Sequence, residues 1–566
     1  MTGGPDRVRA VAVDFDGTLT HGGRPAPHVL AALAATRSRG TEVVLVTGRI
    51  LTELAAVFPD VDDHVDLVCA EDGAVLHGPG WTRHLADPVD RRLDPALRAR
   101  GVPFRRGEVI LATTVPFAAA VEAASAETGI RAPCIRNRGE LMIVPGGVDK
   151  GRGTRAALAV LGVSHHHAVA VGDAENDLPM LRAVEIGAAP ANAVPATREA
   201  ADLALAGAAG DAVAELLTPR TLSAVAGMRP RRWDLGVGTG DDGARVTVPG
   251  SRAVVLVSGP SGSGKSSLAG MLAEELVRAR DTLLVIDPEG DYAGLGVLPG
   301  VRVIDGGGPA PSAAEVARAF RDGARAIVLD LSLLDRAGRR AAVAGLLPHL
   351  AAGRRRGGVP HWLLVDEAHE FCDIPGIGDP GDGALLAVTY LPRALPAPLR
   401  DAADAEILLP GATGCAGRAG VPATTLAELA RRGRGHAVVV RHGAATPAHV
   451  APARCRHVRH WHKYVAAHLP ELHRFTFRHP GGAPTGAVAT NMAAFHDLLR
   501  DAPPEVVAHH CACGDLSRWV REVLGDGSLA HRLAAAEALA RDAVLAAIAE
   551  RYPARAEALH AGVPGR

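Results

Sequence analysis

The sequence predicts an α/β protein with two mainly parallel sheets, followed by a mainly helical end. Short apolar runs alternate with stretches of helical spacing, and polar residues suited to phosphate chemistry follow several runs directly. Ligands of open α/β sheets bind at the carboxyl ends of strands. We expect a Rossmann-like domain over residues 1–218, a second α/β domain over 230–450, and a mainly helical region over 451–566.

Composition indicates a soluble protein with several cores. The chain has 566 residues, 48% hydrophobic and 22% charged, with a formal net charge of -1, and that length predicts roughly three or four domains. The near-zero net charge argues against a protein whose whole surface binds nucleic acid. It is compatible with a local basic groove. Seven cysteines without regular spacing, no membrane-length apolar run and no signal-peptide core favour the cytoplasm.

The first apolar run, Val11–Val13, ends in an acidic turn. Two aspartates, Asp14 and Asp16, follow at a spacing of two, and holding them close requires a cation or a proton between them. Such a pair suits phosphoryl transfer, with one carboxylate attacking phosphorus and the other moving a proton. The alternative is an ordinary Asp-Gly turn after a strand.

Three later pieces favour the chemical interpretation. Thr47 follows the expected strand 42–46, where a hydroxyl and free backbone N–H groups form a phosphate cradle. Lys150 stands at the start of an expected helix, where its ammonium neutralises phosphate oxygens. Asp173 and Asp177 follow the strand 168–171 and are suitable ligands for Mg²⁺.

These four pieces, in this order, resemble the haloacid dehalogenase superfamily of phosphatases, and the segments near Asn192 and Asp202 resemble its Cof-type, or IIB, branch. The resemblance implies a Mg²⁺-dependent phosphomonoester hydrolase that acts through an aspartyl-phosphate on a small phosphorylated substrate. It implies that Asp14 is the nucleophile and Asp16 the general acid/base. Thr47 and Lys150 would hold the phosphate, and the implied metal ligands are Asp14, Asp16, Asp173 and Asp177.

The branch also implies a cap inserted at about residues 73–149. We expect in it a strand near 109–113, a helix over 116–127 and a strand near 141–144. Such a cap excludes water and selects small substrates. Its candidates for contact with an anionic substrate are Arg136, Asn137 and Arg138, and a solvated charged hairpin is the alternative. One departure is Asp72, where the branch usually has Asn.

The second domain carries a phosphate-binding loop. A hairpin is expected over 234–238 and 245–248, and then the strand 253–258 enters a Walker A sequence at 259–266 with a helix behind it. The backbone of such a loop faces the β-phosphate, the lysine reaches the β- and γ-phosphates, and the serine binds Mg²⁺. The predicted ATP-binding residues are Gly259, Gly262, Gly264, Lys265, Ser266 and Ser267, with Ser266 on the metal.

An acidic pair, Asp366 and Glu367, follows the strand 361–365. We expect Asp366 to orient Mg²⁺ and Glu367 to polarise the attacking water, which favours ATP hydrolysis. With the DPEGDY sequence at 287–292 between them, the two motifs resemble the HerA/FtsK group of P-loop ATPases over about 233–445. That group includes hexameric DNA translocases, which implies DNA as a partner and a homo-oligomer.

Two departures concern the coupling of hydrolysis to movement. The group often has Gln after the next strand, whereas residues 387–393 contain none. No arginine finger is identified by the sequence, and the candidates, each of which is also typical of a surface residue, are Arg393, Arg400, Arg418 and Arg434.

The third region is rich in His and Arg and resembles no known family. Its His and Cys residues suggest a zinc or anion site. The spacing argues against zinc, because CAC at 511–513 puts one residue between its thiols and no paired zinc spacing is present. We favour a small helical domain with a basic, His-rich face and amphipathic helices over 529–559. The candidate ligands are His457, His460, His462, His509, His510, Cys511 and Cys513.

Three functions are therefore open. The first is a phosphatase fused to an ATPase. The second is a nucleic-acid end-processing phosphatase/kinase, against which the cap and the Asp366–Glu367 pair argue, or a DNA-translocase-associated enzyme. The third is a nucleotide-responsive assembly module.

Overall fold

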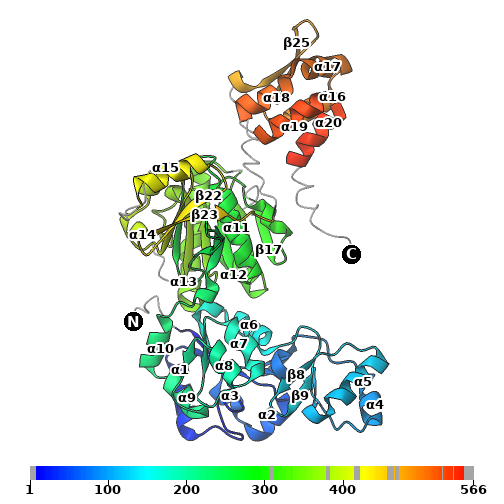
Figure 1. Ribbon diagram of the computed structural model, residues 1–566, viewed down its shortest axis with the longest axis vertical. Helices are drawn as coiled ribbons and strands as arrows, with labels where there is room; N and C mark the ends of the chain where they lie inside the picture. Colours follow the sequence, from blue (N-terminus) through cyan, green and yellow to red (C-terminus); the bar gives the residue numbers. More distant parts are fainter. Residues whose placement is uncertain are drawn as a thin grey trace.

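Two large sheets and a small helical unit follow one another along the chain (Figure 1). The computed structural model describes residues 8–305, 311–332, 334–377, 383–412, 421–455, 465, 469, 471–524, 527–538 and 541–552. The α/β class and the helical end are confirmed. Among the described helices, none has the length and apolar character needed to cross a bilayer.

The first sheet has eight strands in the order β12-β11-β10-β1-β2-β3-β4-β5. Its centre, β1, pairs in parallel with β10 and β2 and is completely buried, as its run of Ala and Val requires. The strands are β1 Ala10–Asp14, β2 Glu42–Val46, β3 Leu67–Ala70, β4 Val75–Gly78, β5 Trp81–His84, β10 Ala168–Val171, β11 Ile186–Ala189 and β12 Leu203–Ala204.

Eight helices accompany this sheet. The α10 helix lies beyond the expected domain end at residue 218, yet Leu222 and Val225 pack into the first core, so the domain includes it. The helices are α1 Pro27–Ser38, α2 Leu51–Val57, α3 Val61–His64, α6 Lys150–Leu161, α7 Leu178–Ala183, α8 Pro195–Ala200, α9 Ala209–Leu216 and α10 Pro219–Ala226.

The cap is a separate antiparallel sheet with the order β6-β7-β9-β8. It begins later than residue 73, because β4 and β5 pair with β3 and extend the first sheet instead. The expected strand, helix and strand are β7, α5 and β9. The elements are α4 Leu93–Ala99, β6 Arg105–Arg106, β7 Leu111–Thr114, α5 Ala118–Thr128, β8 Cys134–Asn137 and β9 Glu140–Ile143.

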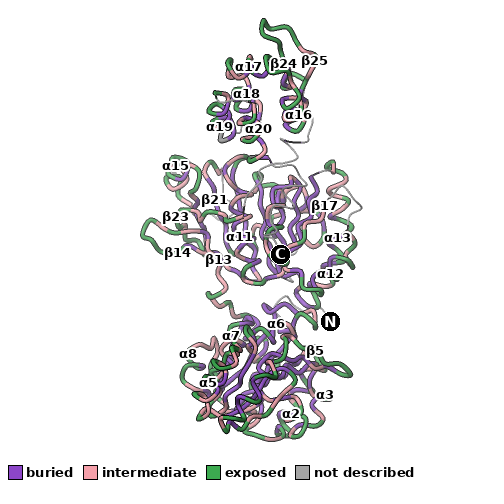
Figure 2. The backbone as a smooth tube through the Cα atoms, turned by 90° about the vertical axis from the view of Figure 1, so that its right-hand side faces the viewer, coloured by how far each residue is buried: buried purple, intermediate pink, exposed green. Residues whose placement is uncertain are grey.

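The second sheet has 11 strands in the order β14-β13-β23-β22-β21-β15-β20-β19-β16-β18-β17. Burial is continuous along its central strands (Figure 2), which pack between two apolar layers. The strands are β13 Leu235–Thr239, β14 Arg245–Val248, β15 Val254–Ser258, β16 Leu283–Asp287, β17 Val301–Asp305, β18 Ala326–Asp330, β19 Trp362–Val365, β20 Ala384–Thr389, β21 Ala405–Leu408, β22 His436–Arg441 and β23 Ala444–Val450.

The helices of the second domain include α11, which starts directly after the phosphate-binding loop. They are α11 Lys265–Arg278, α12 Ala313–Arg321, α13 Arg336–Gly357, α14 Ala397–Asp401 and α15 Ala423–Arg432. The third unit has its own core around Phe475, Phe495 and Trp519. Its elements are β24 Phe475–Arg478, β25 Pro484–Ala489, α16 Met492–Asp501, α17 Pro504–Cys513, α18 Asp515–Trp519, α19 Gly527–Glu537 and α20 Arg541–Arg551.

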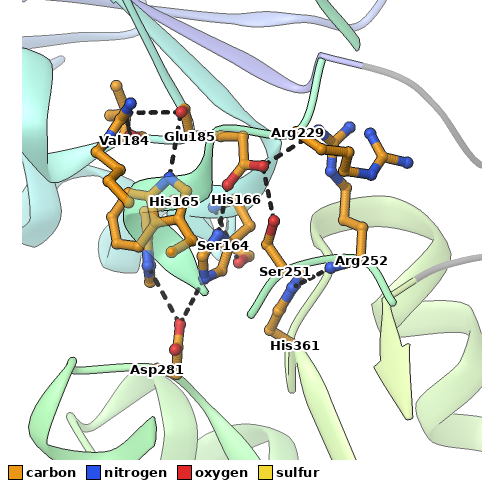
Figure 3. Close-up of polar contacts among 12 residues, drawn as sticks. Ser164, His165, His166, Val184, Glu185, Arg229, Ser251, Arg252, Asp281 and His361 are labelled. Atoms are coloured by element: carbon orange, nitrogen blue, oxygen red, sulfur yellow. Dashed lines mark hydrogen bonds and ion pairs between the residues drawn. The ribbon is translucent and has the colours of Figure 1, made fainter. Parts of the chain in front are cut away.

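A buried polar contact joins the first two domains (Figure 3). We call it the seam, and it consists of His165, His166, Glu185, Ser251, Arg252 and Asp281. His166 lies between two carboxylates, with Nδ1 2.6 Å from Glu185 and Nε2 2.7 Å from Asp281 of the other domain. Burial lowers the pKa of His166, but Asp281 and Glu185 outweigh it and raise that pKa to about 9. The seam therefore holds an imidazolium at neutral pH.

Candidate functional site

The four sequence pieces of the first domain meet at one edge of its sheet. Asp14 ends β1, and Asp173 follows β10, the neighbouring parallel strand. Thr47 follows β2 on the other side, while Lys150 is the first residue of α6. Parallel strands direct their carboxyl ends to the same edge, which is why residues more than a hundred positions apart come together.

Lys150 is the centre of charge in this site. Its ammonium donates to Oδ1 of Asp14 and to Oδ1 of Asp177, at 2.6 Å each, and the side chain is 1% exposed. Burial lowers the pKa of Lys150, but the two carboxylates raise it overall. Burial and the charge of Asp177 in turn raise the pKa of Asp14, against the opposing effect of Lys150. One lysine thus neutralises only part of the acidic cluster.

Three buried carboxylates of the site suit a hard cation. Each of Asp14, Asp173 and Asp177 offers an oxygen, and these oxygens lie within 4.8 Å of one another. Thr18 donates to Oδ1 of Asp173 at 3.0 Å, which orients it, and Oδ2 of Asp177 accepts two backbone N–H groups. Mg²⁺ prefers a few carboxylate oxygens together with waters and a substrate phosphate. The donor set therefore fits Mg²⁺.

Asp16 lies outside that cluster. Its carboxylate forms a two-point ion pair with Arg49, at 2.6 and 2.7 Å, and is 38% exposed. The acidic cluster therefore forms without Asp16, which was predicted as a further metal ligand, while its place in the turn after Asp14 leaves it available for proton transfer. The ion pair with Arg49 was not predicted, although Arg49 ends the Thr47 turn.

Thr47 is almost completely buried at the end of β2. Its hydroxyl accepts from the backbone N–H of Arg49 at 3.1 Å, and its own N–H donates to the carbonyl of Cys69. These bonds fix the turn that is expected to hold phosphate.

The cap reaches the site through Arg138. This residue sits at the turn between β8 and β9 and donates to Oδ2 of Asp173. Behind it, buried Glu71 of the first domain accepts the backbone N–H groups of residues 108–110 at 2.8 to 3.0 Å, which holds the cap to the core. Of the three cap candidates, the structure brings Arg138 to the acidic cluster and shows no such contact for Arg136 or Asn137.

Asp72, the departure from the branch pattern, lies beside the site. Asn176 donates to its Oδ1 at 2.9 Å, whereas Oδ2 of Asp72 and Oδ1 of Asn176 are buried without a hydrogen bond among the described residues. Burial raises the pKa of Asp72. The position is thus strained electrostatically as well as by its positive φ of 52°.

The phosphate-binding loop lines a cavity of about 490 Å³ with Lys265, Ser266 and Ser267. Gly262 and Gly264 have φ of +80° and +105°, values that favour glycine, and Gly264 is the N-cap of α11. Lys265 folds back to donate to the carbonyl of Pro260 at 3.1 Å. Gly259 precedes the cavity, where an added Cβ would lie 2.6 Å from the hydroxyl of Ser263.

Glu367 borders the same cavity, and Asp366 lies buried directly before it at the end of β19. Tyr292 donates to Oδ2 of Asp366 at 3.0 Å, a contact that the sequence did not indicate. Burial and Asp291 raise the pKa of Asp366 to about 6, and burial and Asp366 raise that of Glu367 to about 7. The cavity thus has a carboxylate that exchanges a proton near neutral pH.

The strand that follows the acidic pair, β20, lies between β15 and β19. Its end therefore faces the phosphate-binding loop, at the place where the group often has Gln. In this chain Tyr390 follows the strand, and the centre of its ring lies 6.0 Å from Nζ of Lys265. The hydroxyl of Thr389 forms a hydrogen bond with Nδ1 of His369 at 3.1 Å. An aromatic ring, and no side-chain amide, therefore lies next to Lys265 at the end of this strand.

The DPEGDY segment is held by its own first residue. Both oxygens of Asp287 accept backbone N–H groups, from residues 289–291 and from Tyr292, at 2.7 to 3.2 Å. This cage fixes the turn that carries Tyr292 to Asp366.

The candidate arginine fingers differ in position. Arg434 borders the cavity at the phosphate-binding loop. Arg400 donates to the carbonyl of Arg393, so these two lie together elsewhere. Arg418 lies outside the described residues.

The His-rich region is described only in part. His457, His460 and His462 lie outside the described residues. His510 accepts the N–H of Arg478 at 2.9 Å and bonds Asp515 at 2.8 Å, which makes it a structural residue. His509, Cys513 and Asp515 form a partly exposed group that offers three potential ligands, whereas Cys511 is absent from that group.

Comparison with known proteins gives two family matches. Residues 11–89 and 126–217 match the model described as haloacid dehalogenase-like hydrolase, and residues 253–337 match that of the helicase HerA, central domain. A phosphoglycolate phosphatase of Methanothermobacter thermautotrophicus is 31% identical over 218 residues, which cover 37% of this chain and 96% of that protein. One of Methanopyrus kandleri is 30% identical over 228 residues, covering 37% and 94%. The crystal structure of Thermoplasma acidophilum 0175 covers 38% of this chain and 99% of its own, at 17% identity and a TM-score of 0.33.

Proposed function

Through its first 217 residues the chain belongs to the haloacid dehalogenase-like hydrolases, as the IIB resemblance predicted, and it carries a HerA central domain behind them. From this premise we propose that the first domain hydrolyses a small phosphomonoester through an aspartyl-phosphate on Asp14. The observation that carries the proposal is the convergence of Asp14, Lys150 and Asp177 in one buried cluster.

The chain's own residues support two chemical steps. A carboxylate oxygen of Asp14 attacks phosphorus, the ester oxygen leaves, and Asp16 supplies its proton. Asp16 then takes a proton from water, which attacks the aspartyl-phosphate and releases inorganic phosphate. Lys150 and the Thr47 turn hold the phosphoryl oxygens, and Arg49 positions Asp16. Mg²⁺ held by Asp14, Asp173 and Asp177 would neutralise the phosphoryl charge.

For the substrate we propose a phosphorylated small acid of the phosphoglycolate class. Relatives that carry this name align with the whole first domain. The cap supports a small substrate, because Arg138 projects from it onto Asp173 and so covers the acidic cluster. A guanidinium at this point also suits a second anionic group on the substrate.

The test is phosphate release by the full chain from phosphoglycolate, a sugar phosphate, a nucleoside monophosphate and a DNA 5′-phosphate. We expect phosphoglycolate to have the highest kcat/KM, with activity lost in EDTA and restored by Mg²⁺. Arg138→Ala should raise KM for phosphoglycolate, whereas Arg92→Ala, an exposed cap arginine, should not change it. Preference for the DNA end would contradict the proposal and favour end processing.

For the second domain we propose ATP binding and hydrolysis. The support is the cavity that Lys265, Ser266 and Glu367 share. Glu367 would polarise water, and Ser266 and Asp366 would hold Mg²⁺. Measuring ADP formation with and without DNA separates the alternatives: turnover stimulated by DNA supports a translocase, transfer of phosphate to DNA ends supports a kinase, and negligible turnover supports an assembly module.

A further inference from the structure

A second cavity lies where the first two domains meet, away from both phosphate sites. It measures about 340 Å³ and has walls from both domains. It is lined by five arginines and by no Asp or Glu; the arginines are Arg152, Arg155, Arg280, Arg321 and Arg325. Its size is at the lower end of the range for small-molecule sites, which begins at roughly 300 Å³.

The positive charge in this cavity is not balanced. Within the described part of the chain, none of the five arginines forms an ion pair; Arg152 and Arg155 instead donate to backbone carbonyls, those of Gly147 and Ala279. Burial lowers the pKa of Arg155, Asp281 opposes this effect, and Arg280 and Arg325 lower the pKa further. Asp281 compensates only in part, because its carboxylate also pairs with His166 of the seam. Guanidinium groups held this close favour a bound anion.

The cavity also touches elements that lead to both phosphate sites. Arg152 and Arg155 lie on α6, whose first residue is Lys150 of the phosphatase site. Arg280 is the second residue after α11, whose first residue is Lys265 of the phosphate-binding loop. The α6 helix lies at the edge of the first domain that faces α12 of the second (Figure 1). A ligand here would contact both domains at once.

We propose that this cavity binds a small phosphorylated ligand, no larger than a mononucleotide, and that the ligand bridges the two domains. Guanidinium groups from both sides bind the phosphate oxygens in paired hydrogen bonds. The apolar wall, which includes Phe320 and Val359, accommodates an uncharged part of the ligand. This site is additional to the two proposed phosphate sites and does not depend on their activities.

The first test locates the anion directly. Crystals of the full chain are soaked in sodium tungstate, a phosphate analogue, and anomalous difference maps are calculated. We expect a peak in contact with Arg155, Arg280 and Arg325, whether or not the phosphatase and ATP sites also fill. Tungstate at the Lys150 or Lys265 site with none in this cavity would overturn the proposal.

The second test measures binding in solution. Titration calorimetry with pyrophosphate and with AMP uses the full chain carrying Asp14→Asn, which prevents hydrolysis at the first site, and Lys265→Ala, which weakens binding at the phosphate-binding loop. Adding Arg280→Ala and Arg325→Ala should raise Kd for at least one probe by about tenfold or more. Arg318→Ala, an exposed arginine of α12 outside the cavity, should leave Kd unchanged.

Equal binding by all variants would contradict a site in this cavity. Binding of a DNA duplex that the paired substitution abolishes, with no binding of pyrophosphate or AMP, would also overturn the proposal, because the cavity would then be part of a nucleic-acid surface. Replacing both arginines with Lys keeps the charge and tests the paired geometry: we expect a weakening smaller than that of the Ala pair.

Discussion

The two proposed phosphate sites of this chain are built in opposite ways. In the first domain, charged side chains form the site: Lys150 lies between Asp14 and Asp177, and all three are buried. In the second domain, the backbone forms the site, through the glycine-containing loop that ends at Gly264 and the start of α11. The first site is therefore sensitive to single charges, and the second to backbone shape and to one lysine.

The lysines of the two sites, Lys150 and Lys265, differ in their partners. Lys150 already has carboxylate partners, whereas Lys265 donates to a carbonyl of its own loop and borders an open cavity. A buried ion pair that loses one partner leaves an uncompensated charge, which costs roughly 3–5 kcal/mol. We expect substitutions in the first site to affect folding and activity together, and substitutions in the second to affect mainly activity.

The largest expected effect is that of Asp14→Asn on phosphate release. The amide keeps the size of the side chain but cannot attack phosphorus, so kcat should fall on the order of 10⁴-fold or more. The measurement is phosphate release under saturating substrate, with ATP turnover of the same preparation as the control. Loss of ATP turnover as well would show that the two sites are not independent.

Lys265→Ala should produce the converse result. Without its ammonium the loop still forms, but the β- and γ-phosphates lose their cation, and ATP turnover should fall by about 10²-fold or more. Phosphate release by the first domain and the midpoint of urea unfolding should stay close to those of the wild type. A large fall in stability would contradict the contrast between the two lysines.

Sequence patterns predicted the candidate residues that lie at the ends of strands and the starts of helices. Asp14, Lys150 and Lys265 each follow a strand or start a helix, and strand ends meet by the rules of α/β sheets. The contacts of Arg49 with Asp16, Arg138 with Asp173 and Tyr292 with Asp366 were not predicted, because such contacts depend on side-chain direction and on the position of the cap. The seam was missed as well, since His166 and Asp281 are 115 positions apart and belong to different domains.

The seam provides a test of whether the two domains stabilise each other. The pKa of His166 is raised from 6.5 to about 9 in the folded chain, and at roughly 1.4 kcal/mol per pKa unit this difference corresponds to about 3 kcal/mol. Because the folded pKa is the higher one, this stabilisation is complete below pH 6.5 and is lost as the pH rises through about 9.

The measurement is urea unfolding of wild type and His166→Gln between pH 6 and 10. We expect the difference in free energy of unfolding to be largest at pH 6 and to shrink toward pH 10. His449→Gln, at an exposed side chain of β23 in the second domain, should show a small difference in the free energy of unfolding. A difference that is constant with pH would mean that His166 contributes by packing alone.

The smallest expected effect concerns Asp72, at the margin of the charge-dependent site. Its Oδ2 and Oδ1 of Asn176 are both buried without a hydrogen bond among the described residues. In Asp72→Asn, the new amide N–H can donate to Asn176 while the remaining oxygen keeps its present bond, and a buried carboxyl of raised pKa is removed. We expect the free energy of unfolding to rise by about 1 kcal/mol, as measured by urea unfolding at pH 7. Asp149→Ala, which removes the side chain that caps α6, should lower it instead by a similar amount. If Asp72→Asn destabilises the chain, the carboxylate is needed to balance Lys150, and the site then depends on four acidic groups.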